Sequence, residues 1–186
     1  YYMPFAKSIT KNFDTFLSKL FLFGILMSDQ EMAHKEEMKE INNWLVILAT
    51  SYSKMSENIL VNILHSLYPA SQIDHVGQTK ETGDVIITRK GKPKILVENK
   101  DWGKNVVQEE VKKFIHDIET QKCCGIFLSQ NYGIANKENY EINIHDGNVL
   151  VYVHETKNDP EKIKIAIDIV DHIKEQLDEL DSDEEV

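Results

Sequence analysis

Three residues near the middle of the chain, Asp84, Glu98 and Lys100, carry side chains that could act together on a divalent cation. Asp84 opens one strand-like apolar segment, and Glu98 and Lys100 lie at the end of the next. The residues between the two segments, Lys90–Pro93, predict a turn. If this turn is symmetric about Gly91, each residue n faces residue 182 − n, and Asp84 then lies directly opposite Glu98.

This arrangement has a definite chemistry. Opposed side chains on neighbouring strands lie within roughly 5 Å of one another, and alternation along a strand places Glu98 and Lys100 on one face. A register slip of one residue would separate the two carboxylates. Two carboxylates this close repel unless a hard cation such as Mg²⁺ or Mn²⁺ joins them. A cation at this site would bind a water molecule, and the neighbouring lysine could orient or deprotonate that water. Such a set of groups predicts the hydrolysis of phosphodiester bonds.

The Glu-x-Lys tripeptide alone indicates little, because copies lie at residues 37–39, 98–100, 110–112 and 155–157. Two of the other three copies lie on helical patterns. The last follows a strand that has no acidic strand partner before it. Only the copy at 98–100 both ends an apolar strand and follows a strand that opens with Gly83 and Asp84. This context favours a site over ordinary surface exposure.

These features resemble those of the PD-(D/E)XK, or restriction-endonuclease-like, nuclease superfamily. The resemblance covers about residues 55–153: an acid-bearing helix, a strand opened by Gly-Asp, a strand ended by Glu-x-Lys, a helix and an apolar strand. Gly83 stands where the motif nominally has proline. The resemblance implies an α/β fold with a restriction-endonuclease-like core, in which helices flank a mixed central sheet, and an N-terminal helical extension precedes this core.

The resemblance also implies roles for particular residues. Asp84 and Glu98 would hold Mg²⁺ or Mn²⁺, with the backbone carbonyl of Val97 as a third ligand. Lys100 would be the catalytic lysine. Glu57 falls where many members place a helical glutamate that assists the metal through water or a second ion, and an ordinary solvated helix acid is the equal alternative. The implied catalytic set is therefore Asp84, Glu98, Lys100 and Glu57.

The distribution of charge bears on the substrate. A net charge of −10 is unfavourable for a protein that binds a phosphate backbone. Residues 80–113, however, hold nine basic and six acidic residues, so this segment has a net charge of +3 and the remainder −13. Lys104 and Lys113 lie in the segment and are the candidate phosphate contacts. Lys113 shares a helix face with Glu110 and Asp117, and plain surface charge is its alternative role.

The apolar pattern predicts the elements that position these side chains. A first helix is expected at Phe13–Met27, and a second begins at a capping box in Ser28–Glu31 and ends at a break near Ser51–Ser56. Further helices are expected at Glu57–Leu67 and Val106–Gln121. The last helix begins at Pro160, is capped by Asn158 or Asp159, and ends at about Leu180. Strands are expected at Ile73–Val76, Asp84–Arg89, Ile95–Asn99, Gly125–Ser129, Tyr140–Ile144 and Val149–Val153, the last two turned at Asp146-Gly147. This order predicts a helical region at 1–54, a nuclease-like core at 55–156, and a C-terminal helix with an acidic tail at 157–186.

The predicted second helix has a heptad pattern. Its apolar residues alternate in spacing between three and four: Met38, Ile41, Leu45, Leu48, Tyr52, Met55 and Ile59. Such a helix packs within its own domain, forms a coiled coil with a second copy, or forms a helical hairpin. A homodimer through residues 38–59 would suit a nuclease, because two active sites can cut two strands.

Other features bound the cellular context. The adjacent Cys123 and Cys124 point to opposite faces of a strand and make no zinc-ligand spacing. Without a disulfide framework we expect an intracellular location, in the cytoplasm or the nucleus or nucleoid. The apolar run Leu20–Met27 is too short to span a bilayer, and no small-residue cleavage pattern follows it, so no membrane association is expected.

Together these observations predict a metal-dependent endonuclease or exonuclease that hydrolyses phosphodiester bonds, with DNA as the expected nucleic acid. Two alternatives stay open. A nuclease-fold module could bind nucleic acid or a protein partner without cleaving. An assembly protein could act through its N-terminal helix.

Overall fold

The structure is a computed structural model that describes residues 15, 18–19, 31–76 and 83–184. The predicted helix Phe13–Met27 and the start of the next lie largely outside the described residues. The chain divides into two compact units, Tyr1–Met55 and Ser56–Val186. The second unit contains the sheet and carries the candidate site.

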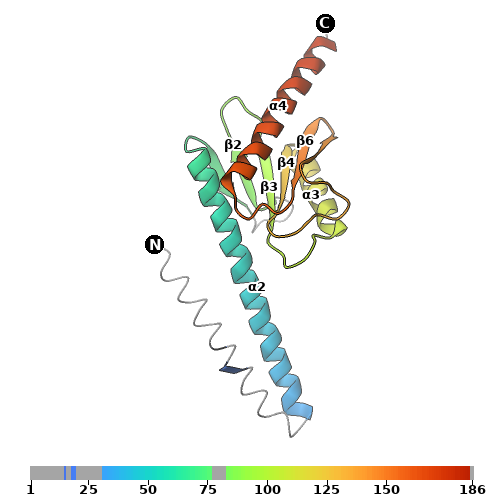
Figure 1. Ribbon diagram of the computed structural model, residues 1–186. Helices are drawn as coiled ribbons and strands as arrows, with labels where there is room; N and C mark the ends of the chain where they lie inside the picture. Colours follow the sequence, from blue (N-terminus) through green and yellow to red (C-terminus); the bar gives the residue numbers. More distant parts are fainter. Residues whose placement is uncertain (1–14, 16–17, 20–30, 77–82, 185–186) are drawn as a thin grey trace. The chain divides into compact units, whose positions relative to one another are not determined.

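The described elements follow the order expected from the sequence and place the protein in the α/β class (Figure 1). The helices are α2 (Glu31–Leu67), α3 (Gln108–Gln121) and α4 (Pro160–Glu184). The strands are β1 (Gln72–His75), β2 (Val85–Thr88), β3 (Ile95–Lys100), β4 (Cys124–Ser129), β5 (Glu141–His145) and β6 (Asn148–Val153). These strands form a six-stranded mixed sheet in the order β1-β2-β3-β4-β6-β5.

The hairpin of β2 and β3 sets the register on which the candidate site depends. The antiparallel pairs are Val85↔Val97, Ile86↔Leu96 and Ile87↔Ile95. Each pair satisfies the relation between n and 182 − n, so the predicted register is confirmed. The turn passes through Gly91 at a φ of +70°, which glycine adopts without strain.

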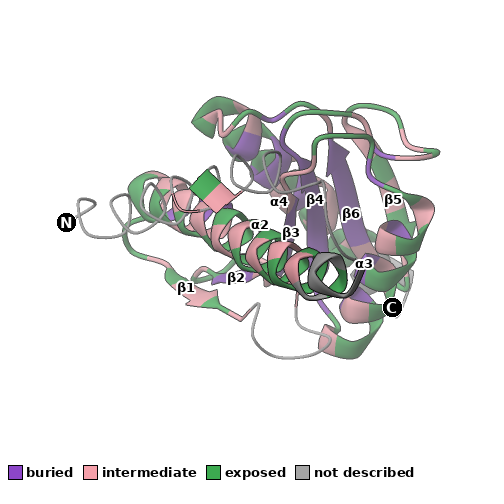
Figure 2. Ribbon diagram, turned by 90° about the horizontal axis from the view of Figure 1, so that it is seen from below, coloured by how far each residue is buried: buried purple, intermediate pink, exposed green. Residues whose placement is uncertain are grey.

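The sheet separates two apolar layers. On one face it packs against Leu60 and Leu64 of α2 and Ile167 of α4. On the other face it packs against Phe114 and Ile118 of α3, which is the crossover between the parallel strands β3 and β4. All six residues of β4 are buried, and the central strands are buried along most of their length (Figure 2). Side chains at the end of β3 are therefore held by packed layers on both sides.

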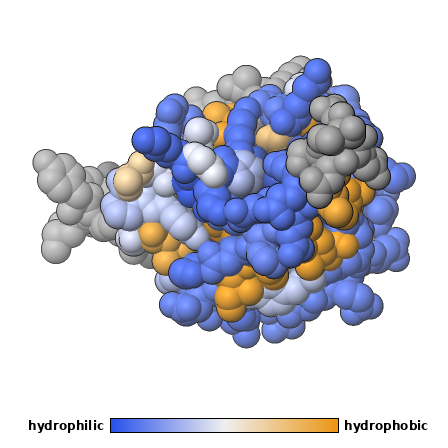
Figure 3. Space-filling view, turned by 90° about the horizontal axis from the view of Figure 1, so that it is seen from above, coloured by the Kyte–Doolittle hydropathy of each residue, from blue (hydrophilic) through white to orange (hydrophobic). Residues whose placement is uncertain are grey.

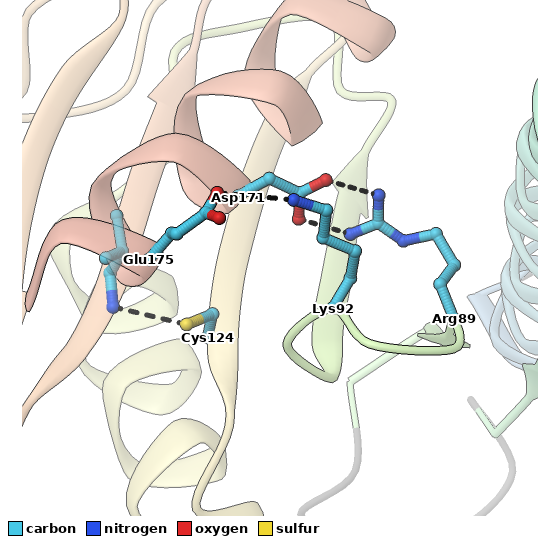
Figure 4. A network of polar contacts seen from close by, with 6 residues as sticks. Arg89, Lys92, Cys124, Asp171 and Glu175 are labelled. Carbon is cyan, nitrogen blue, oxygen red and sulfur yellow. Dashed lines mark hydrogen bonds and ion pairs between the residues drawn. The ribbon is translucent and has the colours of Figure 1, made fainter. Parts of the chain in front are cut away.

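An ion pair between Arg89 and Asp171 fastens α4 to the hairpin that carries the candidate site (Figure 4). Nη1 and Nη2 of Arg89 donate to the two carboxylate oxygens of Asp171, each at 2.6 Å. Both side chains are nearly buried, at 9% and 13% exposed. Lys92 and Glu175 form a longer, exposed pair at 3.5 Å. In addition to its apolar contacts, α4 is thus held to the sheet by a bidentate charge-assisted contact.

Several local predictions are confirmed. The β5–β6 turn has positive φ at Asp146 and Gly147, as a two-residue type I′ hairpin requires. Asp159 accepts a hydrogen bond from the backbone N–H of Glu161 at 2.9 Å, so it is the cap of α4. The two neighbouring cysteines lie in opposite apolar layers, and the Sγ of Cys124 accepts a backbone N–H in the layer under α4 (Figure 4).

Three details differ from prediction. α2 is continuous across Ser51–Ser56, so the predicted break there is wrong; single polar residues cost a helix little while its apolar spacing continues. α3 begins two residues later than predicted, because Val106 forms a bridge with Ile134. α4 passes its predicted end at Leu180 and reaches Glu184, so much of the expected acidic tail is helical.

Two surfaces bear on partners. In the first unit, Met38, Leu45 and Tyr52 of α2 are 42%, 45% and 48% exposed, and their spacing of seven puts them on one stripe of the helix.

The face of the molecule seen from the C-terminal end of α4 is mainly hydrophilic, with smaller hydrophobic patches (Figure 3). Among the described helices, none combines the length and the apolar character that crossing a membrane requires.

Candidate active site

Asp84 lies beside Glu98 at the end of the hairpin farthest from its turn. The backbone N–H of Asp84 donates to the Val97 carbonyl at 3.3 Å. The backbone N–H of Asn99 donates to the Asp84 carboxylate at 2.8 Å. Asp84 therefore contacts the residues on both sides of Glu98. The register and the alternation along each strand place both carboxylates on the face that α3 covers.

Gly83 permits this approach of Asp84 to β3. Its φ is +66°, and a Cβ atom there would lie only 2.5 Å from a methyl carbon of Leu96. Proline holds φ near −65°, so the nominal proline of the motif cannot adopt this conformation. The glycine at this position is a requirement of the local geometry in this chain.

The Lys100 ammonium lies between two carboxylates. Its Nζ is 2.6 Å from Oε1 of Glu98 and 2.8 Å from Oε2 of Glu110. Glu98 reaches it along the same face of β3, and Glu110 reaches it from the first turn of α3. Lys113 lies one turn further along α3, 3.6 Å from Glu110, with 70% of its side chain exposed. The end of β3 and the start of α3 thus form one charged cluster.

Burial controls the ionisation of this cluster. It raises the pKa of Asp84 from 3.8 to about 8, and the negative charge of Glu98 acts in the same direction. Burial also raises the pKa of Glu98, although the charge of Lys100 opposes it. Burial acts to lower the pKa of Lys100, but Glu98 and Glu110 outweigh it and the pKa is raised. Lys100 is therefore an ammonium at neutral pH, and the two carboxylates would gain from a further positive charge.

The Val97 carbonyl, which is the expected third metal ligand, pairs with the backbone of Asp84. This carbonyl accepts the backbone N–H of Asp84 and so points along the sheet toward the β2 side. The side chains of Asp84 and Glu98 stand roughly perpendicular to the sheet, on the α3 face. The role of the Val97 carbonyl as a third metal ligand therefore stays a prediction, and the side chains that this geometry offers to a cation are the two carboxylates.

Glu57 lies in α2 and contacts β1. Its Oε2 is 2.8 Å from Nε2 of His75, and 15% of its side chain is exposed. Its negative charge is among the causes that raise the pKa of Asp84, after burial and the charge of Glu98. The structure therefore brings Glu57 within electrostatic reach of Asp84 and gives it a histidine partner that sequence reasoning missed.

A chain of buried polar groups fixes the middle residue of the Glu-x-Lys tripeptide. Asn99 donates through Nδ2 to Oγ of Ser56 at 2.9 Å, and its Oδ1 accepts from Nε2 of Gln130 at 2.5 Å. Oε1 of Gln130 accepts the backbone N–H of Asn158 at 2.7 Å. These hydrogen bonds join α2, β3, the residue that follows β4 and the segment before α4, and they rigidify the end of β3.

The two candidate phosphate contacts lie on the surface. Lys113 adjoins the charged cluster, and Lys104 is exposed in the segment between β3 and α3. Sequence reasoning missed the contact of Glu110 with Lys100, although the place of Glu110 on the same helix face as Lys113 was a usable signal. Nothing in the sequence marks Asn99, because its partners lie 43 and 31 residues away.

A second group of potential metal ligands lies at the other end of α3. In the part of the chain that the structure describes, Glu119, His145 and Asp146 are the group of three such side chains whose ligand atoms all lie within 4.8 Å of one another. His145 and Glu119 form an ion pair at 2.8 Å, which accounts for their approach without a metal. This exposed group is not the centre that the sequence predicts.

The cluster at the end of β3 combines two adjacent buried carboxylates, a fixed ammonium and nearby surface lysines. Such a set can hold a hard divalent cation through oxygen atoms and can stabilise negative charge on a phosphate. A search for relatives finds no family model, no curated protein and no solved structure that matches the chain.

Proposed function

We propose that the protein is a metal-dependent nuclease with a restriction-endonuclease-like core, and that DNA is its substrate. The observation that carries the proposal is the meeting of Asp84, Glu98 and Lys100 at the end of two paired strands. The order α2-β1-β2-β3-α3-β4 supports the finer fold assignment. It contains, in the same order, the elements on which the resemblance to PD-(D/E)XK nucleases rests.

The two carboxylates suit Mg²⁺ or Mn²⁺. Burial and the charge of Glu98 raise the pKa of Asp84 to about 8, which means that the doubly ionised pair is unfavourable until a positive charge joins it. Carboxylate oxygens, with water in the other positions, are the ligands that these cations prefer. A bound cation would supply a nucleophilic water at neutral pH and would polarise a phosphate oxygen.

The remaining residues have separate tasks in this proposal. Lys100, an ammonium with a raised pKa, orients the attacking water and offsets the charge that develops on the phosphate. Glu57, paired with His75, lies within electrostatic reach of Asp84, and its negative charge favours a cation there. Lys104 and Lys113 hold neighbouring phosphates from the surface, so their contribution should weaken as salt is added.

The test is cleavage of plasmid, single-stranded DNA and RNA in the presence of Mg²⁺ or Mn²⁺. Asp84→Asn, Glu98→Gln and Lys100→Met should each lower the rate by at least about a hundredfold. The chain offers a matched control in its exposed Glu-x-Lys copy, where Glu155 and Lys157 are 61% and 67% exposed. Glu155→Gln and Lys157→Met should cleave like wild type.

The outcomes separate the candidate functions. If the three site variants cleave at the wild-type rate, Asp84, Glu98 and Lys100 are not the catalytic centre. Salt-sensitive binding of nucleic acid without any cleavage would favour the non-catalytic module. Which nucleic acid is cut decides between DNA and RNA.

A further inference from the structure

We propose that Glu110 is a positioning residue, which holds the Lys100 ammonium at the cleavage centre when Glu98 turns to a cation. The inference rests on the proposed function, in which Glu98 is a metal ligand. It assigns to α3 a task that neither strand of the hairpin can perform.

In the proposed function, Lys100 and a divalent cation would compete for the Glu98 carboxylate. Its Oε1 lies 2.6 Å from Nζ of Lys100. The ammonium thus neutralises the negative charge of Glu98 that would attract a divalent cation. A cation bound at Glu98 repels the ammonium and weakens the pair. Lysine has a flexible four-carbon stem, so Lys100 with no second partner would swing away from the centre.

Glu110 provides the second partner from a separate element. Its Oε2 is 2.8 Å from the same Nζ, and its side chain is only 18% exposed. The next residue, Val111, and Phe114 one turn on are fully buried against the sheet, so the first turn of α3 is firmly placed. The hold of Glu110 on Lys100 therefore does not depend on the state of Glu98.

Glu110 is also prevented from becoming a competing metal ligand. Lys113 lies 3.6 Å from the Glu110 oxygen that contacts Lys100. Two ammonium groups thus form ion pairs with this carboxylate, whereas Glu98 forms an ion pair with Lys100. The charges favour a cation at the β3 carboxylate and leave Glu110 to the lysine.

The first measurement needs neither metal nor activity. Glu98→Gln imitates a Glu98 whose charge is taken by a cation, and ¹H–¹⁵N spectra of lysine ammonium groups show whether Lys100 is still immobilised. The Lys100 signal, assigned with Lys100→Met, should persist in Glu98→Gln and disappear in Glu98→Gln/Glu110→Gln. The matched control is Glu98→Gln/Glu109→Gln, which removes the exposed neighbouring acid and should keep the signal.

The second measurement is steady-state cleavage. Glu110→Gln should lower kcat about tenfold or more with KM changed less than about twofold, Glu110→Asp should recover part of kcat, and Glu109→Gln should match wild type. Loss of the Lys100 signal in Glu98→Gln alone, or an unchanged kcat in Glu110→Gln, overturns the inference. If wild type cleaves nothing, the proposed function fails and with it the catalytic meaning of Glu110, while the spectra still show whether Glu110 holds Lys100.

Discussion

The Lys100 ammonium lies 2.6 Å from the Glu98 carboxylate, on the same face of β3. Against the effect of burial, Glu98 and Glu110 raise the pKa of Lys100. Of the two roles that the sequence leaves open, proton acceptor and fixed cation, the geometry therefore favours the fixed cation. In the proposed mechanism, Glu98 would have to leave Lys100 in order to hold a divalent cation, and Glu110 would remain as the partner of Lys100.

Cation binding should strengthen as the pH rises. Burial and the charge of Glu98 raise the pKa of Asp84 to about 8, so below that pH the carboxylate pair carries a proton that a cation must displace. The Kd for Mn²⁺ should fall by up to about tenfold per pH unit between about pH 6 and 8, and level off above. Calorimetry in buffers of different ionisation enthalpy measures both affinity and proton release. A Kd that does not change with pH would contradict the assignment.

Gly83 should be sensitive to substitution for two separable reasons. Gly83 and Gly91 both have positive φ, +66° and +70°, but only at Gly83 would a Cβ meet another atom, Leu96 at 2.5 Å. Gly91→Ala should cost about 1 kcal/mol of unfolding free energy from backbone strain alone. Gly83→Ala should cost clearly more and also weaken Mn²⁺ binding, because Asp84 is displaced. Urea denaturation compares the two, and equal costs would show that the contact with Leu96 is unimportant.

The local part of this site could be predicted because it depends on neighbours in the chain. The turn through Gly91 sets the register by its symmetry, and the alternation of side chains then places Asp84 near Glu98. The same reasoning applies to the cap at Asp159, which a single local hydrogen bond confirms. The positive φ of Gly83 could not be foreseen, because it depends on how closely Leu96 packs beneath it.

The contacts that join distant elements could not be predicted from one sequence. The contact of Glu110 with Lys100 depends on how α3 is rotated on the sheet, and that of Glu57 with His75 depends on how α2 crosses β1. The expected role of the Val97 carbonyl came from the resemblance alone. It stays a prediction, because the structure shows only that this carbonyl accepts the backbone N–H of Asp84.

The buried pair of Arg89 and Asp171 should matter for stability more than its exposed neighbour. Removing one partner leaves a buried charge without its counterpart, so Asp171→Leu should lower the unfolding free energy by about 3 kcal/mol. Arg89→Met/Asp171→Leu should recover most of this loss. Lys92→Met, in a pair that is 41% and 62% exposed, is the control and should change stability by less than about 1 kcal/mol. A double variant as unstable as the single would contradict this account.

The exposed stripe of α2 predicts self-association. Leu45, 45% exposed, lies seven residues from both Met38 and Tyr52, as expected for one side of a coiled-coil seam. Sedimentation equilibrium at micromolar concentration should give the mass of a dimer for wild type and that of a monomer for Leu45→Glu. Asn42→Glu, at an exposed position off the stripe, should stay dimeric. A monomeric wild type would remove the dimer from the proposal.

The most direct test is a crystal structure of the protein soaked with Mn²⁺, with anomalous difference density used to locate the ion. The account predicts a peak shared by the carboxylates of Asp84 and Glu98, with Lys100 held by Glu110. Density confined to the exposed group of Glu119, His145 and Asp146, or no density at saturating Mn²⁺, would contradict a metal-dependent centre at the end of β3.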